Sequence, residues 1–441
     1  TSEDQYSDNF PSGVPSLNSG DSVSIAVRLV GDVLDNATLN PTGFAEDDGS
    51  GGAGVTIPIG VLTNAIYARN GVIGSVTQFA PGDTITYRIQ YSIPTGDVEQ
   101  LRLQDYLPLP VLYATEMTAF LDTISASPPP AGSAQFGPSD TFRTLSGIVP
   151  AIAVDATANR VEFVYGTFAN PTNSPALVDI LFTVTVSADP FADGLFLTNQ
   201  VRAREQNTQV ETSTADSIVQ FQLTEPVIRW SNIKGAVASS NPAAVFSPPA
   251  VAPVSFTAPG SGCPRFSGTI HSNGLASTPI RSDVSNIDAG DRVTFAIVVE
   301  NQGTGLHGAF DVRLRDTLPP GFSIPSGGPN ICVTDGTGAP ISFVNIGGGL
   351  FDPAGGIELV DPGPTATPAG ALDPYDPTNG RNVAIITFDL EVDGAGDPAP
   401  VAPRQQLVNT ATLLNYAGQE GGPDHTLTDP SDTAAATIAS P

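Results

Sequence analysis

Short runs of alternating apolar and polar residues fill most of this 441-residue chain. Val, Ile, Thr, Phe and Tyr, the residue types that favour strands, are common in these runs. Clusters of Gly, Pro, Asp and Asn separate the runs, and apolar residues spaced three and four apart, as on a helix face, are almost absent. The pattern predicts an all-β chain built from β-sandwiches.

Three pairs of similar segments recur at a nearly constant spacing along the chain. The pairs are Gly82–Ile89 with Gly290–Ile297, Leu103–Pro108 with Leu314–Pro319, and Leu197–Asn199 with Leu407–Asn409. A constant spacing is the sequence signature of tandem repeats. We therefore expect two similar β-sandwich domains, over residues 65–223 and 224–441, preceded by an N-terminal arm over residues 1–64 that has no counterpart.

The arm contains one clear strand pattern over about residues 22–30. Apolar residues occupy alternate positions there: Val23, Ile25, Val27 and Leu29. The flanking chain, such as residues 46–52, is rich in Gly and acidic residues and is predicted to be flexible. Because a single strand cannot satisfy its own backbone groups, it must join a sheet. That sheet is either its own first domain or, with this segment acting as a donor strand, the sheet of a neighbouring subunit.

The chain is strongly acidic, with 45 Asp and Glu against 17 Lys and Arg and a net charge of −28. Such a charge argues against nucleic acid and against anionic membranes as partners. It fits the solubility of a protein outside the cell, with salt adaptation or diffuse cation binding as alternatives. No apolar stretch is long enough to insert in a membrane. The polar start, Thr1–Gln5, favours an extracellular or cell-surface chain whose export signal has already been removed.

Two cysteines, Cys263 and Cys332, both fall in the second repeat. In an exported protein such a pair predicts a disulfide, and two buried free thiols are the alternative. Closing a loop of this length would stabilise the fold by about 4 kcal/mol on the chain-entropy model.

The chain has one lysine, Lys234, at the head of the second repeat. Successive side chains of a strand point to opposite faces, and by this rule Lys234 shares a face with Ile228 and Trp230. Asp316 and Asn409 likewise share the faces of apolar neighbours. Because isolated buried charges are costly, the three polar groups should lie together.

Burial favours a neutral, nucleophilic Lys234 and a protonated Asp316. Such an acid could polarise the Asn409 carboxamide and move protons while the amine attacks and ammonia leaves. The product would be an intramolecular Lys234–Asn409 isopeptide bond. The alternatives are a simple buried or edge contact between Lys234 and Asp316, and an exposed lysine.

Four ordered motifs, found in both repeats over about residues 65–441, resemble a known repeat. In the second copy they are Glu225–Lys234, Gly290–Phe295, Asp316–Gly321 and Leu407–Thr412. The set is similar to the surface-protein repeat filed as domain of unknown function eleven and to the isopeptide-forming domains of Gram-positive fimbrial subunits. The resemblance implies immunoglobulin-like sandwiches outside the cell and a Lys234–Asn409 bond assisted by Asp316. The first repeat keeps Asp105 and Asn199, but residues 68–71 replace the lysine segment, so no such bond is expected there.

Signals for other chemistry are weak. Asp373, Asp376 and Asn379 lie in a loop rich in Pro and Gly and offer oxygen ligands for Ca²⁺, but their spacing matches no known calcium loop. No nucleophile elbow, Walker loop or dinucleotide motif is present. We expect a protein that is not an enzyme and needs no cofactor or metal.

These observations favour an extracellular structural protein, a pilus-like fibre or filament subunit that pairs with copies of itself head to tail by β-strand addition. The alternative is a cell-surface adhesin that recognises a glycan or a protein through its long loops. An accessory stalk of a larger secreted complex is a third interpretation.

Overall fold

The computed structural model describes residues 21–440 except 36, 39–40, 57, 95–96, 171–173, 207–211, 231–232 and 250–253, and it describes the backbone alone for residues 22–34 and 41–56. The described chain is nearly all β, which confirms the predicted fold class. Its helices are short: η1 (Ala114–Glu116), α2 (Phe142–Ser146) and α3 (Ser272–Ser277). None of the helices in the described part is long and apolar enough to cross a membrane.

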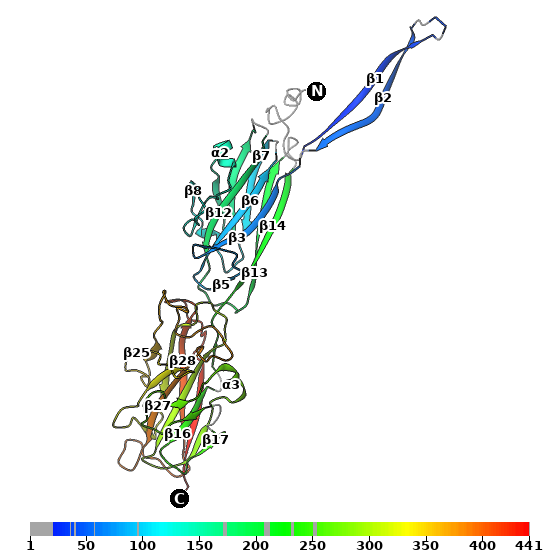
Figure 1. Cartoon of the computed structure of the whole chain (residues 1–441). Helices are drawn as coiled ribbons and strands as arrows, with labels where there is room; N and C mark the ends of the chain where they lie inside the picture. The colour runs from blue at the N-terminus through cyan, green and yellow to red at the C-terminus, as the bar shows by residue number, and fades with distance from the viewer. Residues whose placement is uncertain are drawn as a thin grey trace. The chain divides into compact units, whose positions relative to one another are not determined.

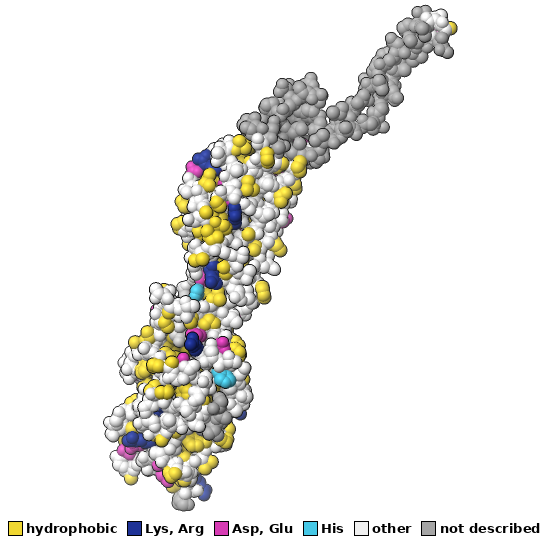
Figure 2. All heavy atoms as spheres, viewed as in Figure 1, with side chains coloured by type: hydrophobic (Ala, Val, Ile, Leu, Met, Phe, Trp, Pro, Cys, Tyr) yellow, Lys and Arg dark blue, Asp and Glu magenta, His cyan; other side chains and the backbone are white. Residues whose placement is uncertain are grey.

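The chain divides into two compact units (Figure 1). The first comprises Thr1–Thr77, Asp83–Thr185 and Leu197–Phe221, and the second comprises Gln78–Gly82, Val186–Phe196 and Gln222–Pro441. On the face shown in Figure 2, the Lys and Arg side chains of the described residues lie scattered rather than gathered in one patch.

Two six-stranded sheets form the sandwich of the first unit, although residues 78–79, at the end of one of these sheets, count with the second unit. In order, one sheet is β4 (Val72–Ile73), β3 (Val61–Arg69), β6 (Thr84–Ile93), β12 (Ala176–Thr185), β9 (Ser133–Phe136) and β8 (Ala119–Ile124). The other is β10 (Ala151–Asp155), β11 (Arg160–Phe168), β7 (Val98–Tyr106), β13 (Phe196–Gln206), β14 (Thr212–Leu223) and β5 (Gln78–Phe79). Alternate residues of β6, among them Tyr87, are buried between the sheets. The Tyr87 ring stacks on Phe182 with ring centroids 5.2 Å apart.

The second unit is also a sandwich. One sheet runs β15 (Ile228–Arg229), β21 (Arg292–Asn301), β27 (Val383–Val392) and β23 (Phe322–Ser323), with β16 (Lys234–Ser239) paired to β21 and β24 (Cys332–Asp335) to β27. The other runs β17 (Val245–Ser247), β20 (Asp283–Ile287), β29 (Ser431–Ile438), β28 (Gln406–Ala417), β22 (Phe310–Thr317), β26 (Gly356–Leu359) and β25 (Phe343–Ile346). Strands β18 (Ser255–Phe256) and β19 (Phe266–Ser267) form a separate pair.

The repeat seen in the sequence is a repeat of strand pairing. The order β3-β6-β12 returns as β16-β21-β27, and β7-β13-β14 returns as β22-β28-β29. Core packing repeats as well, because Phe295 stacks on its cross-strand partner Phe388 as Tyr87 does on Phe182. The two units therefore have equivalent inward-facing positions that are occupied by different side chains.

The N-terminal arm forms a two-stranded antiparallel sheet of β1 (Ser22–Leu34) and β2 (Pro41–Thr56), with Ser22 opposite Thr56. The predicted strand over residues 22–30 lies within β1, but the side chains of Val23, Ile25, Val27 and Leu29 are outside the described residues. β2 includes residues 46–52, which the sequence predicted to be flexible. An antiparallel ladder is held by main-chain hydrogen bonds and does not require apolar side chains. β2 can therefore form although its sequence does not alternate between apolar and polar residues.

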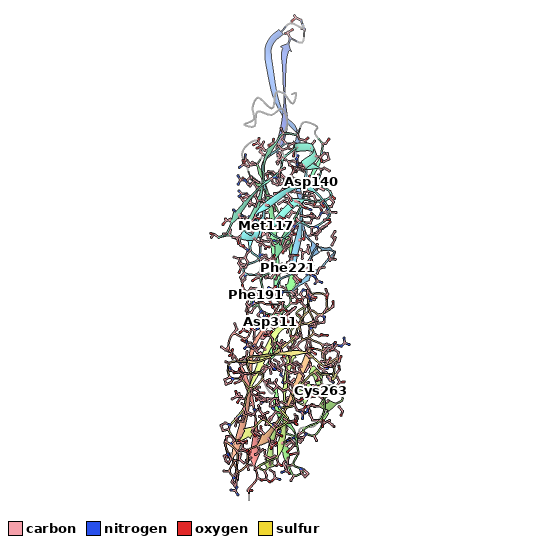
Figure 3. The ribbon with its side chains drawn as sticks, turned by 90° about the vertical axis from the view of Figure 1, so that its left-hand side faces the viewer. Met117, Asp140, Phe191, Phe221, Cys263 and Asp311 are labelled. Carbon is pink, nitrogen blue, oxygen red and sulfur yellow. A yellow bond between two sulfur atoms is a disulfide. The ribbon has the colours of Figure 1, made fainter. Side chains whose placement is uncertain are left out.

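A disulfide and a buried ion pair are among the contacts that fasten an insertion over residues 241–285 to the second unit. Cys263 (Figure 3) and Cys332 form a disulfide across a sequence separation of 69. Nearby, the fully buried Arg265 pairs with Asp389 and donates to the Thr294 hydroxyl at 3.0 Å. Composition gave no sign of this buried ion pair, because arginine is common on surfaces.

Candidate cross-link site

The three residues selected by strand parity meet inside the second unit. Lys234 is the first residue of β16 and lies opposite Ile297 of β21 in one sheet. Asp316 and Asn409 lie on β22 and β28, which are neighbours in the facing sheet. The Lys234 side chain therefore crosses the sandwich to reach the other two. All three residues are at most 1% exposed.

Asp316 is the centre of this cluster. Its Oδ2 accepts a hydrogen bond from Lys234 Nζ, and its Oδ1 accepts one from Asn409 Nδ2 at 2.5 Å. Asn409 Nδ2 also donates to the Thr317 carbonyl at 3.0 Å. Asn409 Oδ1 is buried and has no hydrogen-bond partner among the described residues. The carboxamide is thus held by its nitrogen while its oxygen is unsatisfied.

Aromatic rings exclude water from the lysine amine. Lys234 Nζ lies 4.9 Å from the centroid of the Phe388 ring and 5.4 Å from that of Phe295. Burial lowers the pKa of Lys234, although neighbouring Asp316 opposes this change. Burial also raises the pKa of the Asp316 carboxyl, against the opposing effect of Lys234. Both changes favour a neutral amine beside a protonated acid, the states that nucleophilic attack with acid assistance needs.

A fourth residue, Asp432 on β29, fixes the start of β16. Its Oδ2 accepts hydrogen bonds from the backbone N–H of Ile233 at 2.7 Å and of Lys234 at 3.1 Å. Sequence analysis missed this residue. Nothing local in the sequence shows that Asp432 lies beside a strand about 200 residues earlier.

The first unit holds a related cluster without a lysine. Asn199 Nδ2 donates to Asp105 Oδ1 at 2.5 Å, and Asn64 Nδ2 donates to Asn199 Oδ1 at 2.6 Å. Asn64 lies opposite Ile89 of β6, just as Lys234 lies opposite Ile297 of β21. Asn64 is therefore the structural counterpart of the lysine.

This finding corrects the sequence comparison, which placed residues 68–71 at the lysine position. Asn70 instead donates to Asp83 Oδ1 at 2.5 Å, as Asn241 donates to Asp291 Oδ2 at 2.7 Å. Asn70 thus corresponds to Asn241, at the other end of the strand. Residues 68–71 and 232–235 share only their final glycine, and that single match placed the two segments in the wrong register.

The suggested calcium ligands serve their own loop. Asp376 Oδ1 accepts hydrogen bonds from the backbone N–H groups of Thr378 at 2.7 Å and Asn379 at 2.9 Å. Asn379 Oδ1 accepts a hydrogen bond from the backbone N–H of Arg381 at 2.8 Å. Asp373 makes a backbone hydrogen bond with Arg381. These bonds are those of polar turns.

A second acidic group was not foreseen. Among the described residues, Asp311 (Figure 3), Asp361 and Glu420 place carboxylate oxygens within 4.8 Å of one another. Asp311 and Asp361 also accept backbone N–H groups, and Glu420 is exposed.

Comparison with known proteins gave distant structural similarities. No family model and no curated protein matches the chain. It is similar to the C-terminal domain of the Streptococcus pyogenes antigen I/II-family protein AspA, with 9% identity over 86% of this chain and 99% of that chain and a TM-score of 0.35. The corresponding domain of Streptococcus agalactiae BspA gives 11% identity, 85% and 99% coverage, and a TM-score of 0.36. BcpA, the major pilin subunit of Bacillus cereus, gives 10% identity, 73% and 77% coverage, and a TM-score of 0.26. Values at this level do not define a family.

Proposed function

We propose that this chain is a non-enzymatic extracellular structural protein, the subunit of a pilus-like fibre or surface filament. The observation that carries the proposal is the dry cluster of Lys234, Asp316 and Asn409, which has the parts for a self-made cross-link. A disulfide in the same unit agrees with an oxidising location outside the cytosol.

The cross-linking step needs no cofactor. The neutral Lys234 Nζ attacks Asn409 Cγ, forming the new C–N bond, and the bond from Cγ to Nδ2 breaks. The proton lost by the amine passes through Asp316 to the departing nitrogen, which leaves as ammonia. Asp316 begins and ends protonated, so the step balances and occurs once per chain. Fixed proximity supplies much of the rate.

Asp316→Asn tests the role of the acid, since it keeps the size of the side chain but removes the proton donor. We expect this variant to retain the full sequence mass, without loss of ammonia. The matched control is Asp105→Asn, the same change at the equivalent position of the first unit, which should still lose one ammonia. Loss of ammonia in the Asp316→Asn variant would contradict the assigned role.

The positions of the two residues that the bond would join suit a subunit under tension. Lys234 lies near the start of the second unit and Asn409 lies on its penultimate long strand. Force applied between the ends of this unit would pass through the covalent link and bypass residues 235–408. The disulfide lies inside the bypassed segment.

The arm supplies a means of assembly. Among the described strands β1 and β2 pair only with each other, and such two-stranded ribbons are marginally stable alone. Addition of β1 to the sheet of another copy would give partners to the backbone groups on the edge of β1 that faces away from β2. Repeated from copy to copy, this pairing would produce a head-to-tail polymer. We expect deletion of residues 1–40 to abolish polymers seen by electron microscopy while both units stay folded. Unchanged polymers would exclude the arm as the connector.

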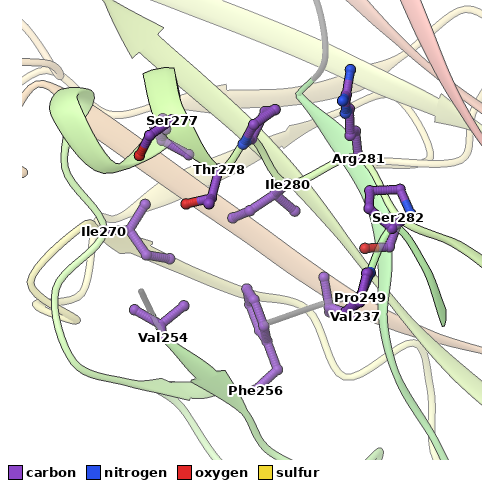
Figure 4. A pocket seen from close by; sticks show the side chains of 13 residues that line it. Val237, Pro249, Val254, Phe256, Ile270, Ser277, Thr278, Ile280, Arg281 and Ser282 are labelled. Atoms are coloured by element: carbon purple, nitrogen blue, oxygen red, sulfur yellow. The ribbon is translucent and has the colours of Figure 1, made fainter. Parts of the chain in front are cut away.

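One observation favours an adhesin as the second candidate. A pocket of about 320 Å³ lies between β16 and the insertion, and its lining includes Val254, Phe256 and Ile270 (Figure 4). This mostly apolar lining suits an apolar side chain of a protein ligand better than a glycan. Specific retention of monomers on a protein array, lost with Phe256→Ser, would support this alternative.

A further inference from the structure

The outer face of one sheet in the first unit carries a group of arginines. They are Arg102 of β7, Arg160 of β11, and Arg202 and Arg204 of β13. The residues that alternate with them, such as Leu103, are buried, so the arginines point away from the core. These are four of the 17 basic residues in a chain whose net charge is −28. Positive charge is therefore concentrated on this face.

This charge is unevenly compensated. Arg202 pairs with Asp216 at 2.7 Å, whereas Arg102 reaches Glu162 only at 3.4 Å. Among the described residues, none forms an ion pair or a side-chain hydrogen bond with Arg204. Arg204 is the direct cross-strand partner of Arg102, and both are exposed. Like charges directly opposite each other destabilise a sheet, and an anion between the two guanidinium groups would remove this cost.

The backbone is irregular where the two arginines meet. On the N-terminal side of Arg102, both neighbours of β7 change register. Gln100 has a left-handed backbone conformation, with a φ of 53°. Residues other than glycine rarely adopt this conformation. Bulges of this kind redirect side chains and are common beside functional sites.

A polar pocket of about 350 Å³ lies beside the pair. It is lined by Gln100, Arg102, Arg204, Glu205, Gln206 and Thr212. The glutamine amides and the threonine hydroxyl can both donate and accept hydrogen bonds. Glu205 is only 2% exposed, and its charge and a hydrogen bond to it add to burial in raising the pKa of Tyr91. The Glu205 carboxyl is thus already bonded to a core residue.

We infer that this pocket binds an acidic sugar, with its carboxylate between Arg102 and Arg204. A planar carboxylate accepts paired N–H donors from a guanidinium group and offsets the repulsion between the two arginines. Sugar hydroxyls that lose water need hydrogen-bond partners, and the rest of the lining supplies them. The net charge of −28 disfavours a polyanion but repels a single carboxylate only weakly. The site uses neither the arm nor the cross-link, so the inference goes beyond the proposed assembly.

Titration of the intact chain with D-glucuronate, followed by ligand-detected NMR, tests this site. We expect glucuronate to bind, and Arg204→Gln to weaken binding by about tenfold or more through loss of charge-assisted hydrogen bonds. Arg202→Gln is the matched control, because Arg202 lies on the same strand and face but outside the lining. It should bind as the unaltered chain does. Equal affinity of the two variants, or no binding of glucuronate to the unaltered chain, would overturn the inference.

Two further ligands separate the sugar from its charge. Glucose lacks the carboxylate, and a glutamate with both ends capped has the carboxylate without the sugar ring. Both should bind more weakly than glucuronate. Glucose binding as tightly as glucuronate would remove the role of the arginines, and equally tight binding of the capped glutamate would replace the sugar by an acidic peptide.

Hydrogen exchange of the β7 and β13 amides gives a second readout on the first unit. Glucuronate should slow this exchange in the unaltered chain more than in Arg204→Gln, because a ligand stabilises the state that binds it. Equal slowing in both chains would contradict a site at Arg204. None of these results depends on loss of ammonia or on polymers, so failure here would leave the proposed function standing.

Discussion

Lys234, Asp316 and Asn409 each depend on the other two because all three are buried. An unpaired buried polar atom costs about 1–3 kcal/mol, and a buried charge costs more. Before reaction the site contains two ionisable groups and an unsatisfied Asn409 Oδ1. The cross-link would replace the amine and the carboxamide by one neutral amide, which lowers the cost of burying them. The reactivity and the instability of the cluster thus have the same cause.

Asp105 shows what burial does when no lysine is present. Burial raises the pKa of Asp105 to about 8, and the hydrogen bond from Asn199 opposes this only in part. The folded first unit therefore binds a proton that the unfolded chain releases near pH 4. Its stability should be greatest below pH 4 as far as this group is concerned, and should fall between pH 4 and 8 by up to about 1.4 kcal/mol per pH unit.

Hydrogen exchange of the β7 and β13 amides in the full chain measures this dependence, because it reports on the first unit separately. The matched control is Asp105→Asn, which has the same size and no titrating proton. The difference between the two chains should grow from pH 5 to pH 8. A difference that stays constant with pH would contradict a protonated Asp105.

At the scale of single strands, β3 pairs with β6 in the same register as β16 pairs with β21, but β3 has Asn64 where β16 has Lys234. The variant Asn64→Lys restores a lysine opposite Asp105 and Asn199. We expect it to lose a second ammonia, because the acid and the carboxamide are already hydrogen-bonded. Asn64→Lys combined with Asn199→Ala is the control and should lose only one. Loss of only one ammonia from the calculated mass of the Asn64→Lys chain would show that half-buried β3 does not shield the amine from water well enough.

The contact of the insertion with β16 depends on a glycine. A Cβ added at Gly235 would lie 2.8 Å from the backbone nitrogen of Ser282 and 3.1 Å from that of Arg281. Because the backbone of Arg281 and Ser282 must move, Gly235→Ala should lower the free energy of unfolding of the second unit by about 1–3 kcal/mol, measured by urea unfolding. Gly262→Ala in the same insertion meets nothing within 4 Å and should have little effect. Equal stability of the two variants would contradict this packing.

Local alternation predicted the strands and the inward faces of Lys234, Asp316 and Asn409, because the direction of a side chain depends only on its own strand. The counterpart of the lysine was missed because it depends on register between distant strands. β3 changes register between Ile66 and Ala68, and β16 does so between Ala236 and Ala238. β2 was missed for a related reason: Gly-rich chain pairs through its backbone and leaves no pattern in its side chains.

For the whole molecule, the two units should respond differently to force. Pulled from its ends, the cross-linked second unit should not lengthen between Lys234 and Asn409, whereas the first unit should unfold fully. In single-molecule stretching under reducing conditions, Lys234→Ala should add a length of about 3.5 Å for each residue released from the 235–408 segment. The same extension in both chains would mean that the link does not carry tension.

The most direct test of the cross-link is the intact mass of the native chain under denaturing and reducing conditions, measured beside Lys234→Ala. We predict a native mass lower than the sequence mass by one ammonia, and the full calculated mass for the variant. A native chain with its full sequence mass would show that Lys234 and Asn409 remain separate, and the proposal of a self-locking fibre subunit would lose its main support.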